Sequence, residues 1–395
     1  MAFNYEINQL ELMQARIKSV PHGWQFTYVG KAFCIRNNLR KPISEEERSM
    51  SPGNYPYYGP TKIQGYIGTF EQDGSYALIG EDGDHFLKFE KHSMTQLVDG
   101  KCTVNNHAHI IEGTKEASRE WFYYYFMHRD IFSFLSRQGA GRYKLNKASL
   151  EKMPLLLPTI VEQKKIAQIL STWDNAISVT EKLLTNSQQQ KKALMQQLLT
   201  GKKRLLDENG VRFNGKWEKK LLSDVADVYQ PKTISQSMMS DSGYPVYGAN
   251  GVIGFYQEFN HETEQIAVTC RGSTCGIVNW TQAKSWITGN AMVINTDNYS
   301  YVSKKFLFYT LNGSDLKYLI SGSGQPQITG NIKTHIINLP CIEEQQKIAT
   351  VLSAADAEIY TLEKKLACLR DEKKALMQQL LTGKRRVKVD EAVAE

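Results

Sequence analysis

The chain has 395 residues, of which 41% are hydrophobic, and its Lys and Arg residues outnumber Asp and Glu by 48 to 41. This length predicts two or three domains that each bury a core, and the mildly basic balance is compatible with a polyanionic partner without requiring one. No apolar run approaches the roughly 18 residues of a membrane span, and the start of the chain lacks the apolar core of a signal peptide, so we expect a soluble, cytoplasmic protein.

The cysteines show no pattern that points to a metal or a disulfide framework. They lack the paired spacing of zinc sites and do not recur at matching positions of the chain. We therefore expect them to be reduced and expect no metal ligand among them. The six residues are Cys34, Cys102, Cys270, Cys275, Cys341 and Cys368.

Residues 1–157 form the first predicted domain. Short runs of β-branched and aromatic residues, bounded by Gly, Asn and Asp, are typical of strands. The domain is therefore expected to be mostly β-structure, with one helix near Trp121 to Leu135.

Residues 158–203 form the first predicted helical region. Pro158 marks its start, because proline is tolerated in a first helical turn and not further inside, and Gly201 marks its end. The segment KKALMQQLLTGK at residues 191–202 recurs letter for letter, 182 positions later, at residues 373–384. The chain is therefore an internal duplication with two equivalent helices. Approximate two-fold symmetry of this kind suits a DNA duplex, whose backbones are related by two-fold axes.

Residues 204–339 form the second predicted domain, a more distant copy of the first. Gly83 of the first domain aligns with Gly272 of the second, 189 positions later, within a series of matched sequence blocks. The turn glycines and apolar positions recur while other side chains differ. This pattern predicts that both domains have the same kind of function and act on different targets. The predicted elements include strands at residues 265–269 and 291–295 and a helix at residues 304–320.

Residues 340–386 form the second predicted helical region, and residues 387–395 are expected to be a flexible tail. Both helices carry an apolar seam at alternating steps of three and four, typical of a coiled coil, with polar Thr180 and Ser187 in the first copy. We expect the helices to pair as an antiparallel coiled coil of about 60 Å, and packing of each helix on its own domain is the alternative. The seam residues are Ile166, Leu170, Ile177, Leu184, Leu194, Leu198, Ile348, Leu352, Ile359, Leu366, Leu376 and Leu380.

The sequence contains no recognisable catalytic motif. It lacks a phosphate-binding Gly-Lys loop, a GxGxxG turn, an HExxH helix, a GxSxG elbow and the motifs of a base methyltransferase. His107 and His109 alternate on a predicted strand, and without a third ligand their placement on opposite faces of a sheet is favoured over a metal pair. We therefore expect neither a catalytic residue nor a metal site.

Basic and amide side chains stand in glycine-framed loops of both domains. In the major groove Arg pairs with guanine and Asn or Gln with adenine, so these residues form the predicted DNA-binding set, although a solvated loop residue is the alternative at each position. Two GxG loops are followed by Arg142 and Lys144 in one copy and by Gln325 and Gln327 in the other. Different half-site preferences would require this exchange, and a variable surface loop would look similar. The full set is Arg36, Asn38, Arg40, Lys62, Arg142, Lys144, Lys232, Asn250, Arg271, Ser273, Gln325 and Gln327.

Four segments of the helical regions carry a family likeness. The helices open with LPTIVEQKKIAQIL at Leu157 and LPCIEEQQKIATVL at Leu339, and they end with ALMQQLLTGKKR at Ala193 and ALMQQLLTGKRR at Ala375. With these segments the chain resembles, over almost its whole length, the specificity subunit of a type I restriction-modification system. The resemblance implies an α+β fold in which two mixed, mostly β target recognition domains alternate with two long helices that pair as an antiparallel coiled coil.

The resemblance also implies a function and partners. Each recognition domain would read one part of a split, asymmetric DNA sequence, and the helices would set the unread gap and dock two methyltransferase subunits. Those subunits would carry S-adenosylmethionine, and separate motor-nuclease subunits would use ATP and Mg²⁺. The chain itself is expected to be non-catalytic and to hold no cofactor.

Two other classes of function stay open at this point. The chain could be a coiled-coil scaffold, or a DNA-binding subunit of another defence complex. It could also be an enzyme with an unfamiliar active site around Arg271 or His107. Salt-dependent binding to random duplex DNA separates a DNA reader from a protein-binding scaffold, because phosphate neutralisation releases counterions.

Overall fold

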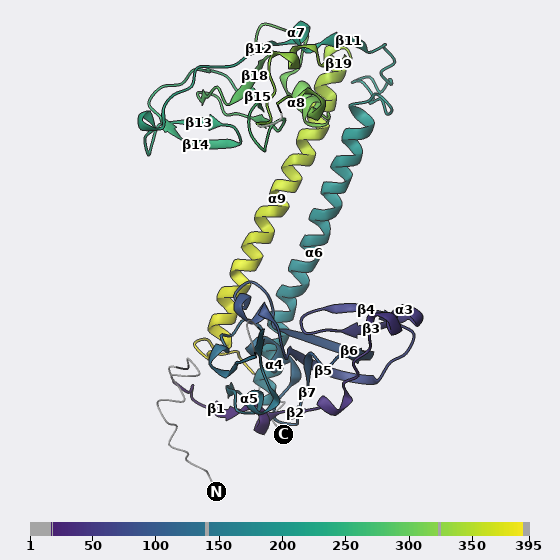
Figure 1. Ribbon diagram of the computed structural model, residues 1–395, viewed down its shortest axis with the longest axis vertical. Coiled ribbons are helices and arrows are strands. Elements are labelled where there is room, and N and C mark those ends of the chain that lie inside the picture. Colours follow the sequence, from purple (N-terminus) through teal and green to yellow (C-terminus); the bar gives the residue numbers. More distant parts are fainter. Residues whose placement is uncertain (1–16, 18, 139–141, 323–324, 390–395) are drawn as a thin grey trace. The chain divides into compact units, whose positions relative to one another are not determined.

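The chain folds into two compact units. The computed structural model describes residue 17 and residues 19–138, 142–322 and 325–389. Unit 1 comprises residues 1–179 and 366–395, and unit 2 comprises residues 180–365. Each unit holds one mostly β region with parts of the two long helices, α6 (Ile160–Leu198) and α9 (Ile342–Leu380), as Figure 1 shows. The expected α+β fold is confirmed, and both long helices lie inside the predicted helical regions.

Unit 1 is built around a six-stranded sheet. The strands of the whole unit are β1 (Gln25–Tyr28), β2 (Cys34–Ile35), β3 (Pro52–Tyr58), β4 (Ile63–Ile67), β5 (Gln72–Gly80), β6 (Thr95–Val104), β7 (Ala108–Glu112), β8 (Ser136–Gln138), β9 (Arg142–Lys144) and β10 (Pro154–Leu157). Its short helices are α2 (Val29–Ala32), α3 (Glu45–Met50), α4 (Arg119–Phe126) and α5 (Lys147–Glu151). The sheet order is β2-β7-β5-β6-β3-β4, and two-stranded pairs form between β1 and β10 and between β8 and β9.

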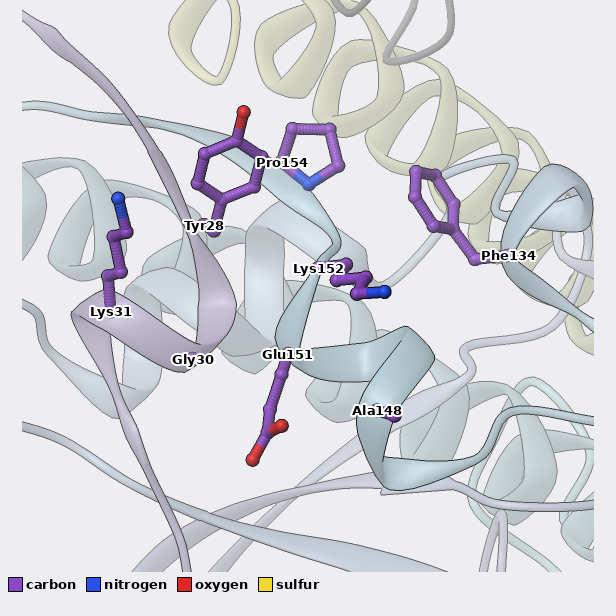
Figure 2. A pocket seen from close by; sticks show the side chains of 8 residues that line it. All are labelled: Tyr28, Gly30, Lys31, Phe134, Ala148, Glu151, Lys152 and Pro154. Carbon is purple, nitrogen blue, oxygen red and sulfur yellow. The ribbon is translucent and has the colours of Figure 1, made fainter.

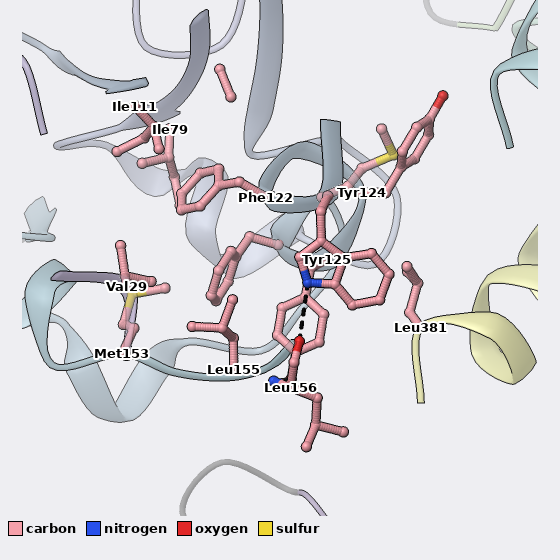
Figure 3. Close-up of a cluster of buried hydrophobic side chains, with 14 of the residues drawn as sticks. Val29, Ile79, Ile111, Phe122, Tyr124, Tyr125, Met153, Leu155, Leu156 and Leu381 are labelled. Atoms are coloured by element: carbon pink, nitrogen blue, oxygen red, sulfur yellow. Dashed lines mark hydrogen bonds between the residues drawn. The ribbon is translucent and has the colours of Figure 1, made fainter. Parts of the chain in front are cut away.

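The core of unit 1 lies around α4, which is rich in buried aromatic residues. Phe122 lies near Ile79 of β5, and Tyr125 lies near Leu156 of β10 (Figure 3). The Trp121 indole donates to the carbonyl of Leu156 at 3.0 Å, and the Tyr125 hydroxyl accepts from the amide of Leu156 at 3.0 Å. Burying one such side chain contributes about 1.5–3 kcal/mol, so α4 anchors the sheet and β10 together.

Unit 2 repeats this plan with smaller sheets. Its strands are β11 (Glu218–Leu221), β12 (Asp227–Tyr229), β13 (Tyr244–Gly248), β14 (Gly251–Tyr256), β15 (Ile266–Thr269), β16 (Val278–Trp280), β17 (Trp286–Ile287), β18 (Ala291–Asn295) and β19 (Ile336–Leu339), and its short helices are α7 (Leu222–Val225) and α8 (Lys304–Asn312). The sheet orders are β12-β18-β15-β16, β14-β13-β17 and β11-β19. The two predicted strands correspond to β15 and β18, and Phe306 and Tyr309 of α8 are fully buried in the core.

The helices predicted at residues 121–135 and 304–320 extend too far, because α4 and α8 end earlier. Equivalent turns follow them: the Asp130 carboxylate accepts from the amide of Phe132 at 2.9 Å, and the Asp315 carboxylate accepts from the amide of Lys317 at 3.0 Å. A short aspartate side chain that bonds a nearby amide competes with the helical pattern. The helix therefore gives way to a turn in both copies.

A glycine follows the end of each long helix, as predicted. Gly201 and Gly383 have φ angles of +67° and +70°, in the left-handed region that glycine adopts without a steric penalty. An amide two residues further on closes back on each helix: Lys203 donates to Gln197 at 3.0 Å, and Arg385 donates to Gln379 at 3.1 Å. These bonds satisfy carbonyl groups that the end of a helix leaves without a partner.

The predicted seam lies on the covered faces of α6 and α9. All of its apolar residues are buried or half-buried, and the polar seam residues Thr180 and Ser187 are only 3% and 8% exposed. The Ser187 hydroxyl donates to the Glu358 carboxylate at 2.9 Å. Ile166 and Leu352 belong to the cores of units 1 and 2, so the seam also packs on each unit. No described helix is apolar over enough of its length to cross a bilayer.

The helices run antiparallel within each unit and are joined there by the same cluster of side chains. In unit 1, Asp174 of α6 accepts from the Tyr124 hydroxyl at 2.7 Å and pairs with Lys373 of α9. In unit 2, Asp356 of α9 accepts from the Tyr309 hydroxyl at 2.6 Å and pairs with Lys191 of α6. Burial, and then the hydrogen-bonded carboxylate, raises the pKa of both tyrosines, which keeps them protonated as donors. We call these sets the two Tyr–Asp–Lys clusters.

A second repeated cluster lies where one helix starts and the other ends. In unit 1, Glu162 accepts from Trp24 at 3.0 Å and from Arg386 at 2.7 Å. In unit 2, Glu344 accepts from Trp217 at 3.2 Å and from Arg204 at 2.6 Å. The carboxylates are 4% and 1% exposed, so each needs its donors. We call these sets the two Trp–Glu–Arg clusters.

Candidate nucleic-acid interface

Each unit has a short loop at the end of a central strand, and the two loops have the same backbone contacts. The first strand-end loop is Glu81–Gly83, after β5, and the second is Cys270–Gly272, after β15. Backbone bonds in unit 1 run from Glu81 to His107 (2.8 Å), from Gly83 to Tyr143 (3.1 Å) and from Leu145 to Glu81 (2.7 Å). Their counterparts in unit 2 run from Cys270 to Asn290 (3.1 Å), from Gly272 to Pro326 (3.1 Å) and from Ile328 to Cys270 (3.0 Å). Matched positions therefore start from equivalent backbone geometry.

The side chains at these matched positions differ in charge. Asp82 stands where unit 2 has Arg271, and Lys144 stands where unit 2 has Gln327. An isolated β-bridge joins Asp82 to Lys144 in one unit and Arg271 to Gln327 in the other. The third residue of each loop is a glycine with a positive φ, +134° and +83°, which a larger residue would adopt only with strain. The backbone is retained while the chemistry that it presents is exchanged.

Glu81 of the first strand-end loop pairs with basic residues from neighbouring segments. Its carboxylate accepts from Arg40, and it lies 3.2 Å from the Lys144 amine and 3.8 Å from His109 Nδ1. Burial alone would raise the pKa of Glu81, but the hydrogen bonds and neighbouring positive charges outweigh it, and its pKa lies below the usual value. Arg40 and Lys144, both in the predicted DNA-binding set, are thus brought together on one carboxylate, with side chains 20% and 30% exposed.

His109 is a buried residue that packs beside this loop. Its ring is 1% exposed. Nε2 lies 2.7 Å from the backbone carbonyl of Leu145, and Nδ1 lies 2.8 Å from the side-chain amide nitrogen of Asn37. These partners fit a neutral ring that donates from Nε2 and accepts at Nδ1, and burial lowers the pKa of His109. His107 lies exposed in the turn before β7, so the expectation that both histidines stand on one strand was wrong, and the described ranges contain no cluster of three possible metal ligands.

Asp82 pairs with His107 at the outer side of the first loop. His107 Nδ1 lies 2.8 Å from Asp82 Oδ2 and 3.0 Å from Oδ1. The aspartate side chain is 25% exposed and the histidine side chain 47% exposed. The pair therefore stands at the surface, where a ligand can reach it.

The second strand-end loop presents a different surface. Arg271, Ser273 and Gln325 are exposed, and Gln327 is half-buried. Gln327 and Ser321 exchange backbone hydrogen bonds of 2.9 and 2.8 Å, which fix the segment beside Arg271. Within the described part of unit 2 no carboxylate forms an ion pair with Arg271. The loop thus exposes a cation, and the neighbouring segment presents amide groups.

The other predicted DNA-binding residues lie outside the strand-end loops. Lys62 and Asn250 occupy the turns of the equivalent hairpins β3–β4 and β13–β14 (Figure 1), and both are exposed. Arg36 pairs with Glu112 at 2.6 Å. Asn38, Arg142 and Lys232 are exposed. Residues 139–141 and 323–324 of the two GxG loops lie outside the described residues.

The sequence interpretation missed Glu81 and Asp82. The spacing of 189 that matches Gly83 with Gly272 also places Asp82 opposite Arg271, so a signal for Asp82 was available. Nothing in the sequence marks Glu81, because its partners Arg40 and Lys144 come from distant segments that only the folded sheet brings together.

A surface pocket of about 650 Å³ lies beside β1 and β10, away from these loops. Figure 2 shows the charged ends of Lys31, Glu151 and Lys152 pointing in different directions around it. Gly30 is needed there because a Cβ atom would come within 2.9 Å of Glu151. The pocket thus shows no convergent set of polar groups, and the strand-end loops are the better candidate site.

Comparisons with known proteins identify the family of the chain. The model of the type I restriction modification DNA specificity domain matches residues 7–186 and 214–368. The MjaVIII type I restriction enzyme specificity subunit of Methanocaldococcus jannaschii is 24% identical over 424 residues, covering 98% of each chain. A Haemophilus influenzae protein assigned as such a subunit is 27% identical over 344 residues, 80% of this chain and 84% of that one.

A solved structure shares the fold. The type I restriction-modification S subunit from M. genitalium superposes with a TM-score of 0.69 at 15% identity, covering 92% of this chain and 97% of that chain. The family model matches most of the chain, in two successive stretches that coincide with the duplicated halves. On this evidence the chain belongs to the type I restriction-modification DNA specificity family.

Proposed function

We propose that this chain is the non-catalytic DNA-reading subunit of a type I restriction-modification complex and that each unit reads one half of a split, asymmetric target. The observation that carries the proposal is the pair of strand-end loops, which keep their backbone hydrogen bonds and exchange their side chains. A common backbone with different donors and acceptors is what two different half-sites require. Base edges in the major groove are distinguished by such donors and acceptors.

The exposed residues of unit 2 suit this role. Arg271 can form a bidentate contact with guanine, and Gln325 and Gln327 can pair with adenine. Exposed lysines such as Lys62 and Lys232 can contact phosphates, which position the protein without specifying sequence. Base readout and phosphate positioning are thus available from different side chains.

We further propose that α6 and α9 set the length of the unread gap and dock two methyltransferase subunits. The duplicated Tyr–Asp–Lys and Trp–Glu–Arg clusters support this, because they fix the pairing of the helices in the same way in both units. Equivalent helix faces suit two copies of one partner. S-adenosylmethionine is assigned to those subunits, and ATP and Mg²⁺ to motor-nuclease subunits, with no cofactor on this chain.

The decisive experiment is reconstitution of the full chain with its methyltransferase subunits, followed by mapping of methylated sites. The expected result is methylation at one split sequence of two unlike halves, and no methyl transfer by this chain alone. Methylation at a continuous sequence would contradict the bipartite reading. A purified chain whose DNA binding has no salt dependence would favour a scaffold, because phosphate contacts release counterions.

Insertion of seven residues at the midpoints of α6 and α9 tests the role of the helices. One heptad preserves the seam and adds about 10 Å. At 3.4 Å per base pair, the unread gap should lengthen by about three base pairs, with both half-sites unchanged. Altered half-site sequences with an unchanged gap would remove the helices from this role.

A further inference from the structure

Opposite charges stand at one equivalent backbone position of the two units. Asp82 and Arg271 both follow the first residue of a strand-end loop, and each is bridged to the neighbouring segment, Asp82 to Lys144 and Arg271 to Gln327. Their neighbours make the same backbone bonds within 0.3 Å, such as 2.8 Å from Glu81 to His107 and 3.1 Å from Cys270 to Asn290. Neither side chain is needed to make these bonds, so the charge reversal alters what the loop presents to a ligand.

We propose that Asp82 and Arg271 are base-reading residues at equivalent positions of the two units: Asp82 accepts from the amino group of a cytosine in one half-site, and Arg271 donates to a guanine in the other. The inference rests on the proposed function and specifies its chemistry. A carboxylate matches the N4 amino group of cytosine in the major groove, and a guanidinium matches O6 and N7 of guanine.

The surroundings of Asp82 leave it able to accept. A carboxylate has about four acceptor positions, and His107 Nδ1 offers a single N–H. Arg40 and Lys144 both lie against Glu81 and compensate its charge. Glu81 therefore adds little to the repulsion of a DNA backbone that approaches Asp82.

The surroundings of Arg271 leave it able to donate. Its side chain is exposed, and the described residues of unit 2 offer it no ion-pair partner. The preceding residue is Cys270, in place of the acidic Glu81 of unit 1. Unit 2 therefore lacks the carboxylate that pairs with the cations of unit 1, and its guanidinium remains available to a base.

The test uses the full chain in complex with its methyltransferase subunits and selects bound duplexes from a randomised pool. The variants are Asp82→Asn and Arg271→Gln, which keep approximate size and remove charge. We expect Asp82→Asn to lose discrimination for cytosine at one position of the first half-site, by roughly 5- to 150-fold, and Arg271→Gln to lose guanine at one position of the second half-site by a similar factor. Each variant is the control for the other, because the half-site that it does not read must stay unchanged.

Two further variants keep the assignment falsifiable. Asp84→Asn removes an exposed neighbouring carboxylate and should leave both half-sites unchanged. His107→Gln removes the partner of Asp82 and should retain the cytosine preference; the same loss of cytosine in both the His107 and the Asp82 variants would overturn the assignment. A melting temperature equal to that of the wild type shows that the variant is still folded.

The outcomes separate this inference from the proposed function. A wild-type complex that selects no split sequence would refute the proposed function itself. A wild-type complex that selects one, with Asp82→Asn unchanged, would refute only the reading of cytosine. If Arg271→Gln weakens binding to all sequences equally and lowers the salt slope by about one, Arg271 contacts a phosphate and its assignment to guanine is wrong.

Discussion

The two units agree at their helix contacts and differ at their strand-end loops. Both Tyr–Asp–Lys clusters use the same residue types, with tyrosine-to-aspartate bonds of 2.7 and 2.6 Å. The loops keep comparable backbone bonds but exchange Asp82 for Arg271 and Lys144 for Gln327. The difference shows that the two copies of the duplicated chain have stayed alike where the helices pair and have diverged where side chains reach solvent.

Energetics explains this division. Removing one partner of a buried ion pair costs about 3–5 kcal/mol, whereas most exposed substitutions change stability by at most about 0.5 kcal/mol. Glu162 and Glu344 are almost fully buried, and Arg271 is exposed. The loops can therefore change while the units remain folded.

The largest expected effect comes from the Trp–Glu–Arg clusters. Glu162→Gln and Glu344→Gln should each lower the free energy of unfolding of their own unit by about 1.5–3 kcal/mol, because the hydrogen bonds from arginine and tryptophan then end on a neutral group. Hydrogen exchange of the adjoining helix amides measures the effect unit by unit. The exposed Glu208→Gln is the control and should change little. Markedly unequal losses would show that the two clusters are alike in geometry only.

Specificity should change next. Gln325→Ala or Gln327→Ala should relax base preference only in the half-site read by unit 2, by about 1–3 kcal/mol for each lost base contact. Selection from randomised duplexes with the reconstituted complex measures the change. An equal loss across all sequences would instead assign these residues to phosphate contact.

The Tyr–Asp–Lys clusters should give a smaller effect. Asp174→Asn and Asp356→Asn keep an acceptor for the tyrosine and remove the ion pair with lysine, and their side chains are 35% and 41% exposed. We expect each to lower the free energy of unfolding by about 1 kcal/mol, near the upper end for solvent-screened pairs. Thermal melts at low and high salt check this, since the loss should shrink as salt screens the wild-type pair. A loss independent of salt would point to packing.

The smallest effect is a pH dependence confined to the first strand-end loop. The pKa of buried His109 lies below its ordinary value near 6.5, so below that pH the unfolded state takes up a proton that the folded loop does not. The contribution of His109 to stability is therefore present above pH 6.5 and is lost as pH falls towards its folded pKa. Hydrogen exchange at Glu81–Gly83, corrected for intrinsic rates, should rise on going from pH 7 to pH 5. The loop at Cys270–Gly272, which contains no histidine or carboxylate, serves as the internal comparison. His109→Gln should reduce the difference without abolishing it, because His85 lies against Gly83 and burial lowers its pKa too.

Much of the fold follows from the sequence. The repeated segment, the prolines and Gly201 and Gly383 locate both long helices, because these features act locally. The predicted ends of α4 and α8 lie too far along the chain. The turns at Asp130 and Asp315 compete with an apolar pattern that continues past them. The parallel pairings of β3 with β6 and of β13 with β17 are tertiary facts that local patterns do not reveal.

Less of the candidate site could be predicted. Residue type alone selected Arg40, Lys144 and Arg271, but it does not show which of them meets a carboxylate. Arg40 and Lys144 share Glu81 only because segments distant in the chain meet at the end of β5. A choice by residue type also favours basic side chains when DNA is the expected ligand, and for this reason it leaves out Asp82.

Unit 1 is discontinuous in the chain, and this has a consequence for synthesis on the ribosome. Met377, Leu380 and Leu381 belong to its core, together with Trp24 and Trp121 from the first part of the chain. Unit 2 is a continuous stretch, residues 180–365, and can close as soon as it leaves the exit tunnel. A nascent chain therefore carries an unfinished N-terminal unit with apolar surface uncovered until almost all of the chain has been translated, the stage at which chaperones protect such intermediates.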